Sequence, residues 1–362
     1  MRRISTIKCK PGMILAKSVY NEIGQTLISK GMVLTELIIS RMKNRGIDSV
    51  FIEDSRTDDI NVGDPISEKT REKALSTIKN TFEELYNEKL ILKPVMRGNL
   101  AETFKSVLNM IIIDLKSNKD AMLMLSSIYA KDTYLYNHSL NVSLYSITIG
   151  IAKGLNQNQL VELGLGALLH DIGKTIIPIE VLGKPSELTE KEYELVRGHS
   201  EAGFEILRKE YGIPLSSAHC AFQHHERLNG SGYPRGLRNK EIHIYAKIVA
   251  IADVYDAVTS ERVYKKPKLP HEALELLFTG VNEDFDIELV EIFKNTVAIY
   301  PIGTNVKLSS GESGIVVDIN NQFPSRPVVR VLENEELGEL KEFYEIDLTK
   351  VLSKVIVECA NF

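Results

Sequence analysis

The chain contains no tryptophan and only three cysteines among its 362 residues. Cys9, Cys220 and Cys359 are far apart and show no Cys-x-x-Cys spacing, so they predict neither a disulfide framework nor a thiolate zinc site. This cysteine usage favours a reducing cytoplasm. The sequence also lacks an apolar run of membrane-spanning length, and no hydrophobic signal segment follows the basic start Met1–Ile4.

Charge of one sign is not in large excess, because 44 basic residues face 49 acidic ones and the formal net charge is −5. Such a chain has no general attraction for nucleic acid, so a nucleic acid polymer is not an expected partner. A phosphate-bearing substrate would have to be held by local cations or metal ions. Hydrophobic residues make up 43% of the chain, which argues against a largely disordered protein.

Four segments with different patterns predict a multidomain protein. Residues 1–60 mix short extended runs with one helical stretch and predict a small N-terminal α/β module, to which position alone assigns a regulatory role. Residues 61–99 predict a linker and a charged connecting helix, through which a homodimer could form. Residues 100–300 predict an α-helical bundle, and residues 301–362 alternate in hydrophobicity like the strands of a small β element.

Imidazole and carboxylate side chains gather in the helical middle of the sequence. Five of the 8 histidines lie there, next to acids or at expected helix ends: His138, His170, His199, His224 and His225. One such histidine is usually an ordinary structural residue, but five of them with well-placed aspartates are typical of a site for several metal ions. The other three, His219, His243 and His271, belong to no such group and are expected to be structural.

Acids accompany these histidines at two places. His170 and Asp171 follow an apolar run, and on a helix they would point about 100° apart, with the imidazole on one ion and the carboxylate bridging to a second. Lys174, one turn later, would share the face of His170 and point at an anion that the metals hold. Asp253 and Asp256 interrupt another apolar helix; Asp253 is the expected ligand, and Asp256 fits equally a partner that orients a ligand imidazole.

The order and spacing of these motifs resemble the HD-GYP subgroup of the HD metal-dependent phosphohydrolases, which are bacterial cyclic di-GMP phosphodiesterases. The resemblance spans about residues 100–300 and includes His-Asp at 170–171 and Gly-Tyr-Pro at 232–234. It implies an all-α helical HD-type bundle as the catalytic core, between the N-terminal α/β module and the C-terminal β element.

The resemblance also implies the roles of single residues. A cluster of two divalent metals, with a third left open, would be bound by His138, His170, Asp171, His199, His224, His225 and Asp253. Asp171 would bridge the metals. Tyr233 and Pro234 would shape the substrate pocket, while Arg262 and Lys265 would contact the phosphate or guanine of the substrate.

One position departs from a variant of the family pattern. Members with three metals can carry a glutamate one helical turn before the first histidine, and Tyr134 stands there in this chain. The departure favours two metals, although Asp132 could still reach a metal through a water.

The ligand set predicts the chemistry. Two ions about 3.5–4 Å apart can lower the pKa of a shared water and stabilise both the attacking and the leaving oxygen of a phosphodiester. Imidazole and carboxylate ligands suit iron or manganese. The expected reaction is hydrolysis of cyclic di-GMP to pGpG, with further hydrolysis to GMP left open. Asp171 and Lys174 are the expected catalytic residues, Lys174 by stabilising phosphoryl charge.

Two alternatives remain at this level. The bundle could hold metals and dinucleotide without turnover and act as a receptor, although an intact ligand set argues against this. It could also hydrolyse another nucleotide, such as mixed cyclic GMP-AMP or a guanosine alarmone, which the Gly-Tyr-Pro loop with Arg262 and Lys265 disfavours.

Overall fold

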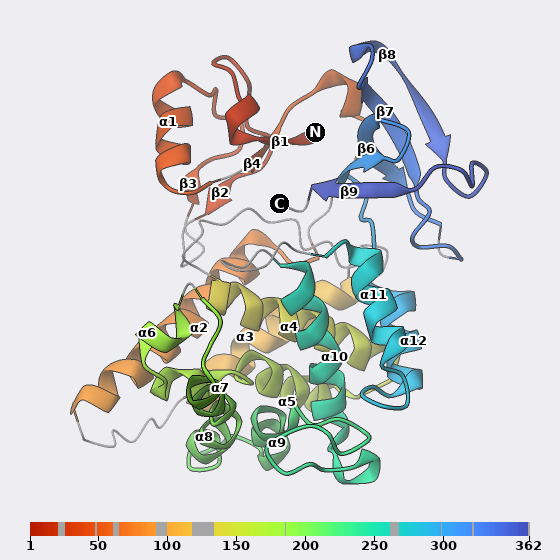
Figure 1. The fold of residues 1–362 in the computed structure, drawn as a ribbon. Helices are drawn as coiled ribbons and strands as arrows, with labels where there is room; N and C mark the ends of the chain where they lie inside the picture. Colours follow the sequence, from red (N-terminus) through yellow and green to blue (C-terminus); the bar gives the residue numbers. More distant parts are fainter. Residues whose placement is uncertain are drawn as a thin grey trace.

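A helical body forms one half of the molecule, and the N-terminal module and the C-terminal sheet both lie on the same side of it (Figure 1). The computed structural model describes all residues except 21–25, 48, 61–64, 92–99, 118–133, 185, 261–267, 298, 321 and 361–362. The predicted fold class is confirmed: an α-helical bundle is joined to a small N-terminal α/β module and a small C-terminal β element.

The N-terminal module combines short strands with one helix. Strand β1 (Arg2–Ser5) pairs with β4 (Ser49–Ile52), and β2 (Val19–Tyr20) pairs with β3 (Thr26–Ile28), both antiparallel. Helix α1 (Glu36–Asn44) begins at Thr35, whose hydroxyl accepts a hydrogen bond from the backbone N–H of Ile38. Its apolar face places Ile39 and Met42 in the core of the module.

The helical body is built from helices whose bounds are α2 (Glu68–Ile91), α3 (Leu100–Ser117), α4 (Tyr134–Ala152), α5 (Gln157–Leu168), α6 (Ile179–Leu182), α7 (Glu190–Arg197), α8 (His199–Leu207), α9 (Leu215–Gln223), α10 (Ile244–Thr259), α11 (Pro270–Thr279) and α12 (Ile287–Thr296). Helix α4 packs against α5 and α10, and α9 packs against the same two helices. One continuous apolar core joins them. Among the described helices, none combines the length and hydrophobicity that crossing a membrane requires.

Helix α2 is the connecting helix that the sequence predicts as a dimer contact. Its side chains Leu75, Ile78 and Phe82 are almost fully buried and belong to the core of the helical body. This apolar face is therefore buried within the chain and is not available for a dimer contact. The homodimer stays a prediction.

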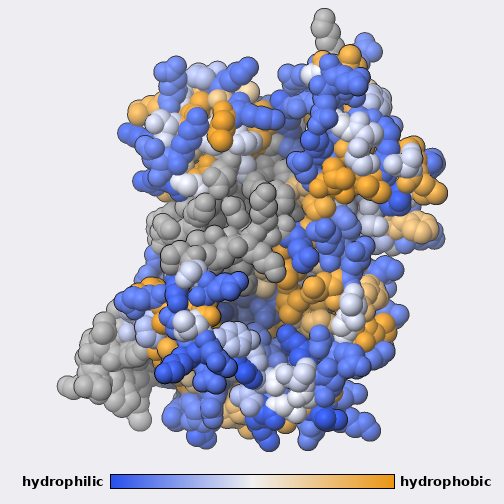
Figure 2. Space-filling view, viewed as in Figure 1, coloured by the Kyte–Doolittle hydropathy of each residue, from blue (hydrophilic) through white to orange (hydrophobic). Residues whose placement is uncertain are grey.

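The C-terminal element is a five-stranded antiparallel sheet in the order β8 (Gly338–Asp347), β7 (Val328–Asn334), β6 (Glu312–Asp318), β5 (Asn305–Leu308) and β9 (Ile356–Ala360). This sheet is the small β element that the alternation of residues 301–362 predicts. The core of the sheet includes Tyr300 and packs against Leu269 and Leu274, next to and within α11. Apolar side chains are also exposed over this sheet and over the helices below it (Figure 2).

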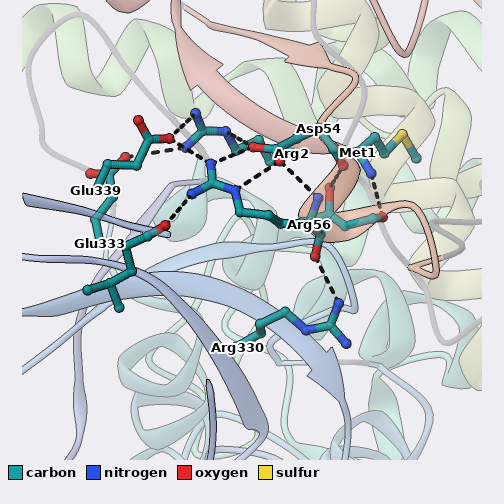
Figure 3. Close-up of polar contacts among 9 residues, drawn as sticks. Met1, Arg2, Asp54, Arg56, Arg330, Glu333 and Glu339 are labelled. Atoms are coloured by element: carbon teal, nitrogen blue, oxygen red, sulfur yellow. Dashed lines mark hydrogen bonds and ion pairs between the residues drawn. The ribbon is translucent and has the colours of Figure 1, made fainter. Parts of the chain in front are cut away.

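A network of charges joins the N-terminal module to the C-terminal sheet (Figure 3). On β7, Arg330 is only 6% exposed, and its guanidinium contacts Asp59 at 2.6 Å and Glu345 at 2.8 Å. Nearby, Arg56 bridges Asp54 at 2.7 Å and Glu339 at 2.6 Å. Beside these ion pairs, an apolar cluster brings Ile60 against Ile315 and Leu332.

Arg330 makes three hydrogen bonds across this junction, two to Asp59 and one to the carbonyl oxygen of Arg56, so we expect its removal to loosen the two ends. Replacement Arg330→Met should lower the free energy of unfolding by about 1–3 kcal/mol, because several hydrogen bonds to charged groups are lost. Urea unfolding followed by circular dichroism measures the change. The control Arg208→Met removes an exposed pair with Glu205 and should cost less than about 0.5 kcal/mol. Equal stability of the two variants would contradict the role of Arg330.

Candidate metal centre

Side chains from five parts of the helical body meet at one buried centre. His138 comes from α4, His170 and Asp171 from the turn after α5, His199 from the start of α8, His224 and His225 from the end of α9, and Asp253 from α10. Of these residues, only His225 is more than 8% exposed. The residues predicted to act together are therefore close in space.

Backbone carbonyls orient three of the imidazoles. The Nδ1 of His170 lies 2.8 Å from the carbonyl oxygen of Ala167, and the Nδ1 of His224 lies 3.0 Å from that of Cys220. His199 makes the equivalent contact, at 2.5 Å, with the carbonyl of Val196. A carbonyl can only accept, so each Nδ1 carries the proton and each Nε2 is left with its lone pair.

His138 is oriented by a carboxylate instead. Its Nδ1 lies 2.7 Å from Oδ2 of Asp256, whose Oδ1 accepts a hydrogen bond from Asn141. Its Nε2 lies 3.1 Å from Oδ1 of Asp253. Burial lowers the His138 pKa, but the hydrogen bonds to Asp253 and Asp256 outweigh it and raise the pKa to about 9. A metal ion on Nε2 would take the place of that proton.

Asp171 lies between two groups of imidazoles. Its Oδ2 is 3.3 Å from Nε2 of His170 and 3.7 Å from Nε2 of His138. Its Oδ1 is 3.4 Å from Nε2 of His199 and 3.9 Å from Nε2 of His224. Burial raises the Asp171 pKa, yet Lys174 and the nearby imidazoles hold that pKa well below its usual range. The carboxylate is therefore ionised, with one oxygen toward each group.

The side chains of this centre are suited to hold divalent metal ions. Two sets of side chains each bring their potential ligand atoms within 4.8 Å of one another: His138, His170 and Asp171 form one set, and His199, His224 and His225 form the other. Nε2 of His170 and Oδ1 of Asp171 are buried without a hydrogen-bond partner among the described residues. A bound cation would give each of these atoms a partner. Burial lowers the pKa of His199 and His224, and that of His225 to about 3, which favours the neutral imidazole that a metal ion can bind.

The turn after α5 differs from the prediction. Helix α5 ends at Leu168, so His170 and Asp171 do not share a helix with Lys174, which lies on a 3-10 turn at Ile172–Ile176. The shared helix face predicted for His170 and Lys174 is thus wrong. The Lys174 ammonium instead lies 2.5 Å from Oδ2 of Asp171.

Gly173 explains why the chain turns here. A Cβ on Gly173 would lie 1.9 Å from the carbonyl oxygen of His199 and 2.6 Å from the backbone nitrogen of Gly203. The 3-10 turn can therefore approach α8 only where no side chain is present. This approach brings Asp171 next to His199.

The Gly-Tyr-Pro loop packs against the centre. The ring of Tyr233 stacks on His225 with centroids 4.6 Å apart, and the backbone N–H of Tyr233 donates to the carbonyl of His225. A Cβ on Gly232 would lie 2.4 Å from the Cα of Glu226, so this crossing also requires glycine. Pro234 follows on the exposed side of the loop.

Glu226 anchors this loop, a role that the sequence does not reveal. Its carboxylate is 2% exposed and accepts backbone hydrogen bonds from Arg235 at 2.8 Å and Leu237 at 2.9 Å. An acid between a histidine pair and a glycine-rich turn carries no signal of this role, because its partners lie nine and eleven residues later.

Several predicted residues lie outside the described part of the chain: Asp132, Arg262, Lys265 and the side chain of Tyr134. The three remaining histidines contact structural neighbours. His243 accepts a hydrogen bond from the Tyr245 N–H at the start of α10, His219 packs beside Phe204, and His271 contacts the Tyr300 hydroxyl.

Gly173→Ala should disturb both folding and metal content. The added methyl group collides with backbone of α8, so we expect a loss of about 1–3 kcal/mol in unfolding free energy and a lower metal content per chain. Gly183→Ala is the control, because its Cβ would meet backbone far less closely, at 3.2 Å from the carbonyl oxygen of Ile179, and a small shift relieves that contact. Denaturation and elemental analysis measure both effects; a Gly173→Ala protein with normal stability would contradict the close approach.

Asp256→Asn should weaken metal binding without removing a predicted ligand. The amide keeps the size of the side chain but loses the charge that orients His138, and such partners are worth about 10- to 100-fold in metal affinity. Titration of the metal-free protein with Mn²⁺ measures the dissociation constant. Asp318→Asn, at the exposed end of β6, should leave the dissociation constant unchanged. An unaltered constant in Asp256→Asn would exclude this role.

Two family models match the chain. Residues 122–289 match the HD domain, and residues 305–362 match a KOW domain associated with the HD domain. The cyclic di-GMP phosphodiesterase PA4108 of Pseudomonas aeruginosa is 37% identical over 212 residues, which cover 59% of this chain and 51% of that protein. The 3'3'-cGAMP-specific phosphodiesterase 1 of Vibrio cholerae is 38% identical over 159 residues, covering 43% and 36%. The chain thus spans about half, or less, of the length of these relatives.

A solved structure agrees with the sequence comparisons. Bd1817, a HDG"Y"P protein from Bdellovibrio bacteriovorus, superimposes with a TM-score of 0.52 at 19% identity and covers 80% of this chain and 97% of that chain. This likeness shows the fold. The resemblance predicted from the motifs is confirmed, because residues 122–289 match the HD domain and the curated relatives above are named cyclic dinucleotide phosphodiesterases.

Proposed function

We propose that the protein is a metal-dependent phosphodiesterase that hydrolyses cyclic di-GMP to pGpG. The proposal rests on Asp171, a buried carboxylate whose two oxygens face two different groups of imidazoles. A carboxylate in this position can bridge two metal ions, and a bridged pair is suited to phosphodiester hydrolysis. Related proteins named as cyclic dinucleotide phosphodiesterases support the substrate class.

Each metal ion would have its own group of protein ligands. His138, His170 and Asp253 would hold one ion, and His199, His224 and His225 the other, with Asp171 between them. When bound, the ions would supply Lewis acidity toward a water and the phosphate oxygens. The Lys174 side chain is 25% exposed, so its ammonium can face both the Asp171 carboxylate and a substrate phosphate.

Iron or manganese is the proposed metal, in a site for two ions. The ligands are imidazole and carboxylate, and no cysteine belongs to either ligand group among the described residues. An intact and buried ligand set also disfavours the alternative of a receptor without turnover. We retain the cytoplasm as the proposed location from the cysteine usage of the sequence.

Mixed cyclic GMP-AMP is the second candidate substrate, because a relative of similar identity is named for it. The two compounds differ in one base. Anaerobic purification with elemental analysis, followed by product analysis on both cyclic dinucleotides, separates them. We expect about two metals per chain and pGpG as the main product; a fully metallated protein that leaves both compounds intact would overturn the proposal.

Asp171→Ala should abolish turnover. Loss of the bridging carboxylate removes a ligand from both metal positions, so we expect activity to fall by at least about 10³-fold. Product formation is measured together with metal content. Asp318→Ala, which removes an exposed carboxylate on the C-terminal sheet, should behave as the wild type. Activity like the wild type in Asp171→Ala would be decisive evidence against the proposed mechanism.

A further inference from the structure

Arg197 lies beside the metal centre without belonging to it. It is the last residue of α7, two positions before His199. Its guanidinium carbon lies 4.5 Å from the ring centroid of Tyr233, and the Tyr233 ring stacks on His225. Tyr233 therefore lies between His225 and Arg197, and it places a positive charge beside one of the two groups of imidazoles.

The other cations near this place already have partners. The Lys174 ammonium pairs with Asp171, and that of Lys184 lies 2.5 Å from Glu192. Arg227 donates to the carbonyl oxygens of residues 224 and 226. In the described part of the chain, by contrast, Arg197 has neither a carboxylate within ion-pair distance nor a hydrogen-bond acceptor, although it is half-buried.

The guanidinium of Arg197 therefore still has its N–H donors available for a ligand. Contact with the face of Tyr233 is a weak electrostatic attraction and uses none of the five N–H donors of Arg197. The planar arrangement of those donors matches two oxygens of one phosphate. An anionic ligand that is held at the metals and extends past Tyr233 would meet them.

A cyclic dinucleotide is such a ligand, because its ring contains two phosphodiesters. Only one of them can be at the metals during hydrolysis. We propose that Arg197 binds the other phosphodiester and so selects cyclic dinucleotides over compounds with a single phosphate; this rests on the proposed function. Tyr233 then has a second task, since its ring holds the guanidinium in place.

Two ligands with the same bases separate this role from stacking or from a purely structural one. The bis-phosphorothioate of cyclic di-GMP resists hydrolysis and keeps both phosphate groups, whereas guanylyl-(3'-5')-guanosine has two guanines and one phosphodiester. Arg197→Met should raise the dissociation constant of the first by at least about tenfold and that of the second by less than about twofold. Arg197→Lys should lie between, because it keeps the charge and loses the planar donors.

Arg208→Met is the matched control, since Arg208 also lies over an aromatic ring, that of Phe204, and we expect no change there. Equal weakening of both ligands by Arg197→Met, or weakening of neither, would overturn the inference. Turnover is measured on the wild-type protein in parallel. If it binds the analogue but releases no pGpG with Mn²⁺ or Fe²⁺, the proposed hydrolysis fails, while the Arg197 result still decides the binding role.

Discussion

Burial of the Asp171 carboxylate is the constraint around which the helical body is arranged. The side chain is 1% exposed, and an ionised carboxylate is stable in such a place only when positive charge or metal surrounds it. The groups that face it come from α4, α8, α9 and the turn after α5, so no single element can meet the requirement. The electrostatic stabilisation of Asp171 therefore depends on how these helices pack.

Local and long-range contributions to this centre can be separated. His170, His199 and His224 are each oriented by a carbonyl three or four residues earlier, so the direction of each Nε2 follows from its own turn. The distances between the imidazoles depend instead on the shared apolar core of the helices. A substitution deep in that core would thus be expected to alter metal geometry before it alters the direction of any ring.

The sequence predicted what depends on residue type and on short spacing. The apolar helix predicted around Asp253 and Asp256 is α10 (Ile244–Thr259), and the residues predicted as ligands lie close together. The 3-10 turn at Gly173, the anchor Glu226 and the position of Arg197 could not be predicted, because each depends on contact with a distant segment. Strand β8 carries little signal in the sequence, because Lys341-Glu342 and Phe343-Tyr344 break the alternation of polar and apolar residues.

The N-terminal module and the C-terminal sheet are in contact although the whole helical body separates them in the sequence. The contacts of Arg330 with Asp59 and of Arg56 with Glu339 span 271 and 283 residues. Closing so long a loop costs little more entropy than closing a shorter one, since that cost grows only with the logarithm of loop length. Salt screens the exposed part of the ion pairs, but it does not screen the apolar contact of Ile60 with Leu332. The N-terminal module and the C-terminal sheet are therefore held to each other by charged and apolar contacts together, and high salt weakens only the charged part.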